Sequence, residues 1–307
     1  MAVTAALVKE LREVTGVGMV DCKNALVETD GNIEKAVELL REKGLSAAAK
    51  KAGRVATEGL VHTYISADNK TGVVIEVNSE TDFVAKNEAF RSFVEAAAKQ
   101  AAGSEADSMD AYFAQGWCED SSITVRDALN QKIAVIGENL NIRRFQRFNR
   151  TEAGALVAYV HGGGRVAVLL HLQCATENDL LMETGKNVCM QIAAMGPKFV
   201  SRDKVPQDFI EKEREILTQQ ALNEGKPANI AEKMVEGRLA KALRDFCLLE
   251  QEYVKDGDLT VAKYLEGAGK EMGAPISVVD FVRYETGEGL EKKEENFAEE
   301  VSKAMQK

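Results

Sequence analysis

The sequence predicts an α+β fold, and two observations lead to that prediction. Residues 61–77 and 155–170 each read as two short apolar strands, separated by turn residues at 68–70 and 161–165. A segment with helical spacing of its apolar residues then follows each pair of strands. We interpret this order of strand, turn, strand and helix as an internal repeat. It predicts two repeated α+β core subdomains with antiparallel sheets.

A short helical module precedes the strands. Thr4 can cap a first helix, residues 15–19 interrupt the pattern, and a second helix is expected from about Asp21. A third helix follows the turn at 30–32, and Gly44 is expected to end it as a C′ glycine. Such a small bundle has little core of its own, so we expect it to dock on the rest of the chain.

The segments that connect and follow the strands are mainly helical. Residues 47–54 combine helix formers and positive charge with little apolar periodicity, which predicts a solvated linker helix. Pro206 and Pro227 can each open a helix, and the two helices together read as a helical hairpin. A last strand is expected at 278–284 and a short terminal helix at 297–305.

Composition argues against several classes of protein. The formal net charge is -10 and the pI about 5.1, which argues against nucleic acid as a direct partner because phosphate binding needs a basic surface. The five scattered cysteines form no CxxC or Cys/His cluster, which favours reduced thiols in a cytoplasmic protein over a zinc site or disulfides. No secretory signal is recognisable, and no apolar run approaches the roughly 20 residues of a membrane span, so we expect no membrane partner.

No pattern in the chain indicates catalytic chemistry. The three histidines, His62, His161 and His171, have no carboxylate or cysteine at a ligand spacing. The glycines at 162–164 lie between two strands, whereas a phosphate cradle needs a following helix N-terminus. Nucleophile, metal and dinucleotide motifs are absent from the sequence, so no catalytic residue, metal or cofactor is expected. His161 lies at an exposed turn, which keeps a contact role open for it.

The segment 78–86, with the sequence NSETDFVAK, follows a predicted strand and precedes a predicted helix. Thr81 or Asp82 can serve as the N-cap, which places Phe83 and Val84 in the first helical turn. An aromatic residue there usually packs into the core as a hydrophobic staple. The alternative is that Phe83 projects as an anchor into a partner's pocket. The local pattern alone favours the core.

Six motifs support a resemblance to a known family over nearly the whole chain. They are LREVTGVGMVDCK at 11–23, NSETDFVAK at 78–86, GENLNIRR at 137–144, YVHGG at 159–163, IAEKMVEGR at 230–238 and ETGEG at 285–289. In this order they resemble the bacterial elongation factor Ts family, whose members promote nucleotide exchange on elongation factor Tu. The chain departs from the family pattern at Val20, at Ser79 and at the pair Glu252 and Tyr253.

The resemblance implies which residues would contact elongation factor Tu. The GTPase domain of Tu would be contacted by Arg12, Met19, Val20 and Lys23. The magnesium and phosphate region would be disrupted by a tip formed by Thr81, Asp82, Phe83 and Val84. Another Tu domain would face His161 and Gly162, and the Tu-facing surface of the core would include Met234 and Val235.

The resemblance also implies a division into modules. These are a ubiquitin-associated-like three-helix bundle at 1–54, core subdomains at 55–144 and at 145–179 with 229–285, an inserted coiled-coil hairpin at 180–228 and a C-terminal module at 286–307. Two assemblies through this hairpin remain open: a homodimer and a 2:2 complex with Tu. From the residues alone, two other functions remain open: a binding module without exchange activity, for a ubiquitin-like or other partner, and an enzyme that uses the glycine turn at His161.

Overall fold

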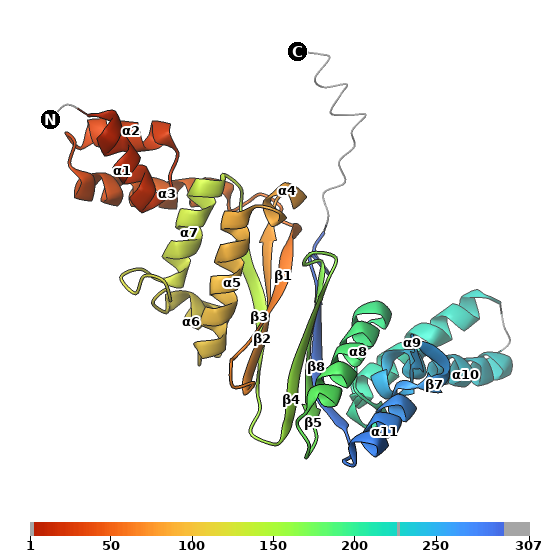
Figure 1. The fold of residues 1–307 in the computed structure, drawn as a ribbon. Coiled ribbons are helices and arrows are strands. Elements are labelled where there is room, and N and C mark those ends of the chain that lie inside the picture. Colours follow the sequence, from red (N-terminus) through yellow and green to blue (C-terminus); the bar gives the residue numbers. More distant parts are fainter. Residues whose placement is uncertain (1–2, 226–227, 292–307) are drawn as a thin grey trace.

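The computed structural model describes residues 3–225 and 228–291, and in these ranges helices cover two three-stranded sheets (Figure 1). The first sheet has the order β1-β2-β3, with bounds Glu58–Ile65, Thr71–Ser79 and Asn141–Asn149. The second has the order β4-β5-β8, with bounds Gly154–His161, Val166–Gln173 and Ser277–Glu285. All four strand pairs are antiparallel, which confirms the predicted α+β class with antiparallel sheets.

The order of strand, turn, strand and helix occurs twice, as the sequence predicts. The β1-β2 hairpin is followed by the one-turn helix α4 (Asp82–Ala85) and by α5 (Glu88–Gly103), and the β4-β5 hairpin by α8 (Asp179–Met195). Each hairpin takes a third strand from later in the chain, because β3 pairs with β2 and β8 pairs with β5. The expected last strand is therefore confirmed as β8. The terminal helix expected at 297–305 lies outside the described residues.

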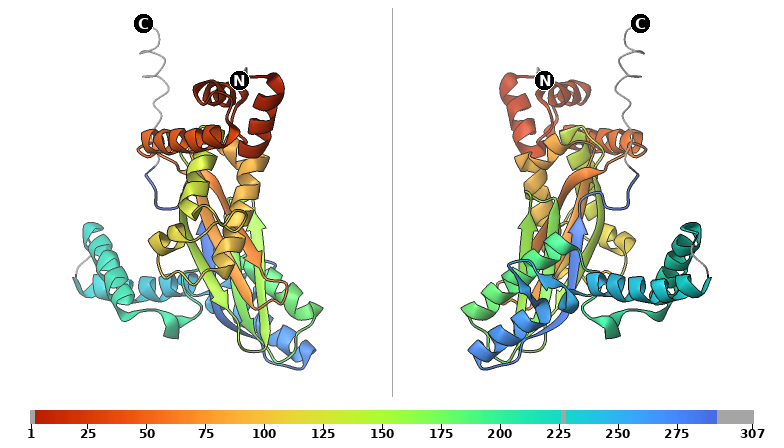
Figure 2. Two further views of the ribbon diagram at one scale, coloured as in Figure 1. Left: turned by 90° about the vertical axis from the view of Figure 1, so that its left-hand side faces the viewer. Right: turned by 90° about the vertical axis from the view of Figure 1, so that its right-hand side faces the viewer.

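The two sheets pack face to face, with helices on the outer faces (Figures 1 and 2). Their shared apolar layer includes Val61, Val74, Leu156, Ala167 and Leu169. At one end of the sheet pair, Asn69 joins the β1-β2 turn to β4. Its Nδ2 donates to the Leu156 carbonyl at 3.0 Å, and its Oδ1 accepts the Leu156 N–H at 2.8 Å. The two sheets are thus held together by apolar packing and by hydrogen bonds at their ends.

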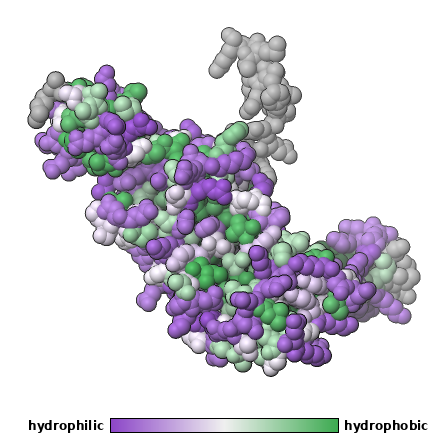
Figure 3. Space-filling model, in the orientation of Figure 1, coloured by the Kyte–Doolittle hydropathy of each residue, from purple (hydrophilic) through white to green (hydrophobic). Residues whose placement is uncertain are grey.

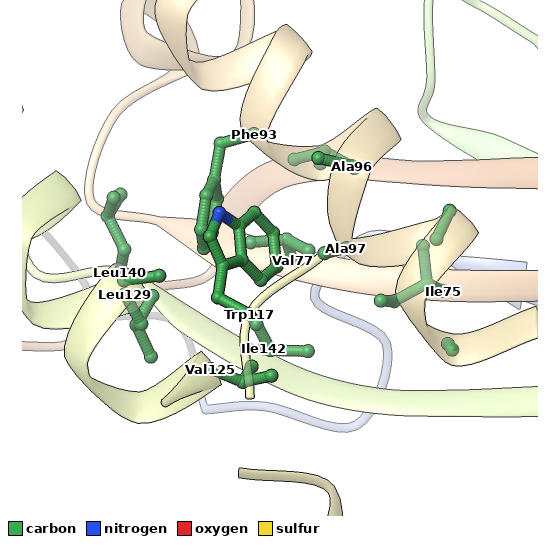
Figure 4. Close-up of a cluster of buried hydrophobic side chains, with 14 of the residues drawn as sticks. Ile75, Val77, Phe93, Ala96, Ala97, Trp117, Val125, Leu129, Leu140 and Ile142 are labelled. Atoms are coloured by element: carbon green, nitrogen blue, oxygen red, sulfur yellow. The ribbon is translucent and has the colours of Figure 1, made fainter. Parts of the chain in front are cut away.

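Three helices cover the outer face of the first sheet: α5, α6 (Met109–Ala114) and α7 (Val125–Ile136). Their core includes aromatic residues of the acidic segment 104–122, to which the sequence pattern assigns no role. Trp117 is buried, and its ring centroid lies 5.4 Å from that of Phe93 (Figure 4). Tyr112 is also buried and donates its hydroxyl to the Ala97 carbonyl at 2.9 Å. This segment therefore builds the core beneath α4 and α5.

The helical hairpin expected from the sequence after Pro206 is confirmed, but it lies later in the chain than the range 180–228 that the resemblance implies. Helices α9 (Gln207–Asn223) and α10 (Ala228–Phe246) pack along each other and share an apolar seam. Helix α8 instead covers the second sheet, beside α11 (Val261–Met272). An amphipathic pattern marks a helix that buries one face, but it does not say whether a sheet or another helix covers that face. The remaining short elements are η1 (Arg202–Lys204), η2 (Leu248–Glu250), β6 (Glu252–Tyr253) and β7 (Asp256–Thr260).

The N-terminal module consists of α1 (Ala5–Thr15), α2 (Met19–Glu28) and α3 (Ile33–Lys51). Thr4 caps α1 as predicted, since its side chain accepts the Leu7 N–H at 3.3 Å. The prediction that Gly44 ends the third helix is wrong, because α3 continues to Lys51. The linker helix expected at 47–54 is confirmed as helical up to Lys51, but it is not fully solvated, because Ala48 is 7% exposed and belongs to the core around α5. The bundle is therefore docked by its own third helix, which packs on α7.

Gly44 lies in the interior of α3, where a Cβ would meet the Ala134 Cβ at 3.5 Å, an ordinary van der Waals distance. We expect Gly44→Ala to raise the free energy of unfolding by about 0.5–1 kcal/mol, since alanine loses less backbone entropy in a helix. Urea unfolding measures the change. Gly137→Ala is the matched control: its Cβ has open space but its φ is +86°, so this variant should lose stability. Destabilisation by Gly44→Ala would show that the α3–α7 contact has no room.

Candidate functional site

The segment Thr81 to Val84 forms an exposed tip at one end of the first sheet. Thr81 is the N-cap of α4, which has a single turn. Phe83 is 77% exposed, whereas its neighbour Val84 is 8% exposed and belongs to the core. The expectation that Phe83 packs inward as a staple is therefore wrong. Val84 takes the inward position, and Phe83 projects into solvent.

The carboxylate of Glu138 holds the tip in place. Its Oε1 accepts the Thr81 hydroxyl at 2.6 Å, and its Oε2 accepts the N–H groups of Thr81 at 3.0 Å and Glu80 at 3.1 Å. One side chain thus satisfies three donors of a turn that α4 is too short to order by itself. Glu138 is not among the predicted site residues, and its only signal in the sequence is its place in the GENLNIRR motif.

A second set of contacts ties the tip to the end of α3. Glu80 Oε1 accepts the Asn139 N–H at 2.6 Å and lies 3.4 Å from the Arg54 guanidinium. Asn139 in turn donates its side-chain N–H to the Arg54 carbonyl at 2.8 Å. The backbone before Phe83 is therefore fixed on both sides. The aromatic ring is presented on a braced turn and not on a free loop.

The charge around the tip is mixed. Lys86 Nζ lies 2.8 Å from Asp82 Oδ2, and this hydrogen bond lowers the pKa of the Asp82 carboxyl below its usual value. Lys86 Nζ also lies 5.7 Å from the centre of the Phe83 ring. Asp82 is therefore ionised at neutral pH, and the tip presents a carboxylate directly beside an exposed aromatic ring.

A wide open groove of about 1020 Å³ lies beside the tip. It is lined by residues 53–55, 57–58 and 80–83 and by Arg165. Arg165 belongs to the turn between β4 and β5 and lies 3.5 Å from Glu58 at the start of β1. The structure thus brings two segments that the sequence analysis singled out, the 78–86 segment and the 161–165 turn, to one groove.

The 161–165 turn presents His161 and Gly162 to solvent. The Tyr159 hydroxyl lies 3.0 Å from His161 Nδ1, and Gly162 has a φ of +59° that favours glycine. Next to it, Gly164 is buried, and a Cβ there would come within 2.8 Å of the Leu60 Cβ. The turn is therefore seated on β1, and the end of the β4-β5 hairpin that carries it lies at the same end of the molecule as α4 (Figure 1).

The N-terminal bundle presents an apolar face on α2. Met19 is 43% exposed and Val20 71% exposed, and Lys23 is exposed one turn further on. Val27, which is not among the predicted site residues, extends the same face and is 58% exposed. Arg12 is exposed on α1. Hydrophobic residues are visible on the bundle among hydrophilic ones in Figure 3, and such an exposed apolar face is typical of a protein contact.

Met234 and Val235 lie on α10, at the opposite end of the molecule from α4 (Figure 1). Val235 is only 3% exposed and packs in the α9–α10 seam with Leu217 and Leu239. A direct partner contact by Val235 therefore disagrees with the structure. The apolar period of α10 reflects its pairing with α9, and Met234 is half-buried beside that seam.

The remaining histidines and the cysteines show no sign of a catalytic or metal site in the described residues. His62 and His171 lie in strands, and burial lowers the pKa of both imidazoles. All five cysteines lie in the described residues and none is in a disulfide, and no cluster that could hold a metal ion occurs in the described ranges. No helix in the described part of the chain combines the length and the apolar character needed to cross a bilayer.

Comparison with known proteins agrees with the motif pattern. The family model for elongation factor TS matches residues 80–288, a range that includes the tip, Glu138 and the 161–165 turn. Elongation factor Ts of Clostridium novyi is 56% identical over 303 residues, covering 99% of both chains. The proteins of the same name from Clostridium perfringens and Clostridium tetani are 54% and 52% identical over 98% and 99% of this chain, and cover 98% and 100% of their own. The chain therefore belongs to the elongation factor Ts family of translation elongation factors.

Proposed function

We propose that this chain is a cytoplasmic nucleotide exchange factor that binds elongation factor Tu with GDP bound and accelerates release of the GDP. The observation that supports this most is Phe83, an aromatic side chain 77% exposed on a turn braced by Glu138. An exposed aromatic ring with few rotamers to freeze is suited to insertion into a partner. In this proposal the protein acts by contact and not as an enzyme. It binds both the GDP-bound and the nucleotide-free form of Tu.

The proposed mechanism is a difference in affinity. GDP and magnesium hold the nucleotide pocket of a GTPase in one arrangement. Phe83 would enter beside that pocket, and the ionised Asp82 would repel the phosphates and displace the magnesium ligands. A factor that binds the empty pocket better than the filled one must weaken GDP binding by the same factor, because coupling between two ligands is reciprocal. GTP then rebinds and expels the factor.

Further contacts would hold Tu in register with the tip. The exposed α2 face with Met19, Val20 and Lys23, together with Arg12, is suited to the GTPase domain, and His161 with Gly162 to a second Tu domain. In this proposal the bundle is a ubiquitin-associated-like docking module, and the two sheets with their helices are repeated core subdomains. The proposed C-terminal module, 286–307, lies outside the described residues from 292 onward. The α9–α10 hairpin would form the contact between two copies, in a homodimer or in a 2:2 complex with Tu.

Release of fluorescent mant-GDP from purified elongation factor Tu tests the proposal. Catalytic amounts of this protein, in excess unlabelled GDP, should accelerate release by roughly 150-fold if a coupling of about 3 kcal/mol between the factor and GDP is expressed in the GDP dissociation rate. If the release rate is unchanged although gel filtration shows that the complex forms, the proposal is wrong and the protein is a binding module without exchange activity.

A further inference from the structure

Thr286 and Gly287 follow β8 and are hydrogen-bonded to both sheets at the end that carries the tip. The Thr286 hydroxyl donates to the Gly164 carbonyl at 3.0 Å, and its N–H donates to the Arg165 carbonyl at 2.9 Å. The Gly164 carbonyl also accepts the Val61 N–H at 2.7 Å. The backbone of the 161–165 turn is thus held by β1 on one side and by Thr286 on the other.

Gly287 connects the same turn to the strand that leads to Phe83. Its N–H donates at 2.8 Å to Oε1 of Glu76, a residue of β2 whose side chain is fully buried. Gly287 has a φ of +72°, and a Cβ there would come within 2.2 Å of the Thr57 carbonyl oxygen. Only glycine fits this close approach to the segment before β1.

The Glu76 carboxylate is the centre of this arrangement. Arg143 Nη1 lies 3.0 Å from its Oε1, Arg144 Nε lies 2.6 Å from its Oε2, and Asn78 Nδ2 donates to its Oε1 at 3.0 Å. Burial raises the pKa of this carboxyl, but hydrogen bonds from Asn78, Gly287 and Arg144 outweigh it, so the pKa lies below its usual value. A buried carboxylate with this many donors fixes the positions of the groups that bind it, which include the backbone N–H of Gly287.

We infer that Thr286, Gly287 and Glu76 form a clamp that sets the spacing between the Phe83 tip and the 161–165 turn, so that both engage one partner together. The inference rests on the proposed function, because it names these residues as positioning residues for exchange. Glu76 is fully buried and Thr286 is 8% exposed, so they act through the two segments they hold and not by touching the partner. β2 transmits the position of Glu76 to the tip that follows it.

Thr286→Val removes the hydroxyl donor while keeping the shape of the side chain. It should lower the maximal rate of mant-GDP release (kcat) about 5-fold and change KM for Tu·GDP less than about 2-fold. The reason is that the spacing between the tip and the turn is needed in the complex in which the Tu pocket is distorted, and less for the first binding of Tu·GDP. Hydrogen–deuterium exchange of the 161–165 amides should speed up in the free protein. Thr286→Ser keeps a hydroxyl and should restore both.

Asn69→Gly is the matched control, because it breaks the hydrogen bonds to Leu156 at the other end of the same sheet pair and keeps the φ of +53° accessible. It should cost stability but leave kcat unchanged. The inference is overturned if Thr286→Val leaves kcat and amide exchange at the wild-type values, or if Asn69→Gly lowers kcat equally. If the wild type itself does not accelerate GDP release, the proposed function fails, and amide exchange alone then decides whether the clamp exists.

Discussion

Phe83→Ala should reduce the acceleration of GDP release from elongation factor Tu by roughly 30-fold, the effect of losing an anchor worth about 2 kcal/mol. The fold should not change, because the ring is 77% exposed and the core position of the turn belongs to Val84. Stopped-flow release of mant-GDP measures the rate, and circular dichroism with thermal unfolding measures the fold.

The control for this variant is Val254→Ala in the turn between β6 and β7, which removes another exposed apolar side chain, 47% exposed, outside every segment proposed to contact a partner. It should leave the release rate at the wild-type value. Equal losses in the two variants would mean that exposed apolar surface in general drives the effect. An unchanged rate in Phe83→Ala would remove the ring from the mechanism.

Glu138→Ala should lower exchange about 10-fold although its side chain does not project with Phe83. The substitution leaves the N–H groups of Glu80 and Thr81 and the Thr81 hydroxyl without their acceptor. Each of these donors that solvent does not reach then destabilises the turn by about 1–3 kcal/mol. The turn should then sample other conformations, and fewer of them present the ring. Amide hydrogen exchange at residues 80–84 and the release rate measure the two effects together.

Glu138→Gln separates bracing from charge. Its amide oxygen can still accept from Thr81, so exchange activity should lie between those of the wild type and Glu138→Ala. Full activity in Glu138→Ala, with faster amide exchange at residues 80–84, would show that the tip does not need to be ordered before it binds.

Much of the fold follows from local patterns in the sequence. The strands appear where β-branched residues run between turn residues, as at 73–77, and Thr4 caps its helix by a contact that spans three residues. The prediction for Gly44 fails because a C′ glycine and a mid-helix glycine look alike in the local sequence. The contact with Ala134 on α7, which accommodates Gly44 within a continuous helix, is distant in sequence.

The site was predictable only in part, for the same physical reason. One-turn helix α4 has room for a single inward residue, and the sequence does not say whether Phe83 or Val84 occupies that position. The brace from Glu138 to Thr81 spans 57 residues and leaves no periodic signal. Val235 belongs to an apolar stripe on α10 that the sequence shows correctly. The sequence does not show that α9 of the same chain, and not a partner, covers this stripe.

Magnesium dependence of the Phe83→Ala defect tests the central claim most directly. The proposed tip acts by disturbing the magnesium and phosphate site of Tu, so its contribution should fall when magnesium is already absent. Mant-GDP release should be measured at saturating wild type and Phe83→Ala, with magnesium and with excess EDTA. The account predicts a roughly 30-fold defect with magnesium that shrinks to less than about 3-fold without it. A defect of the same size in both conditions, or no defect in either, would contradict it.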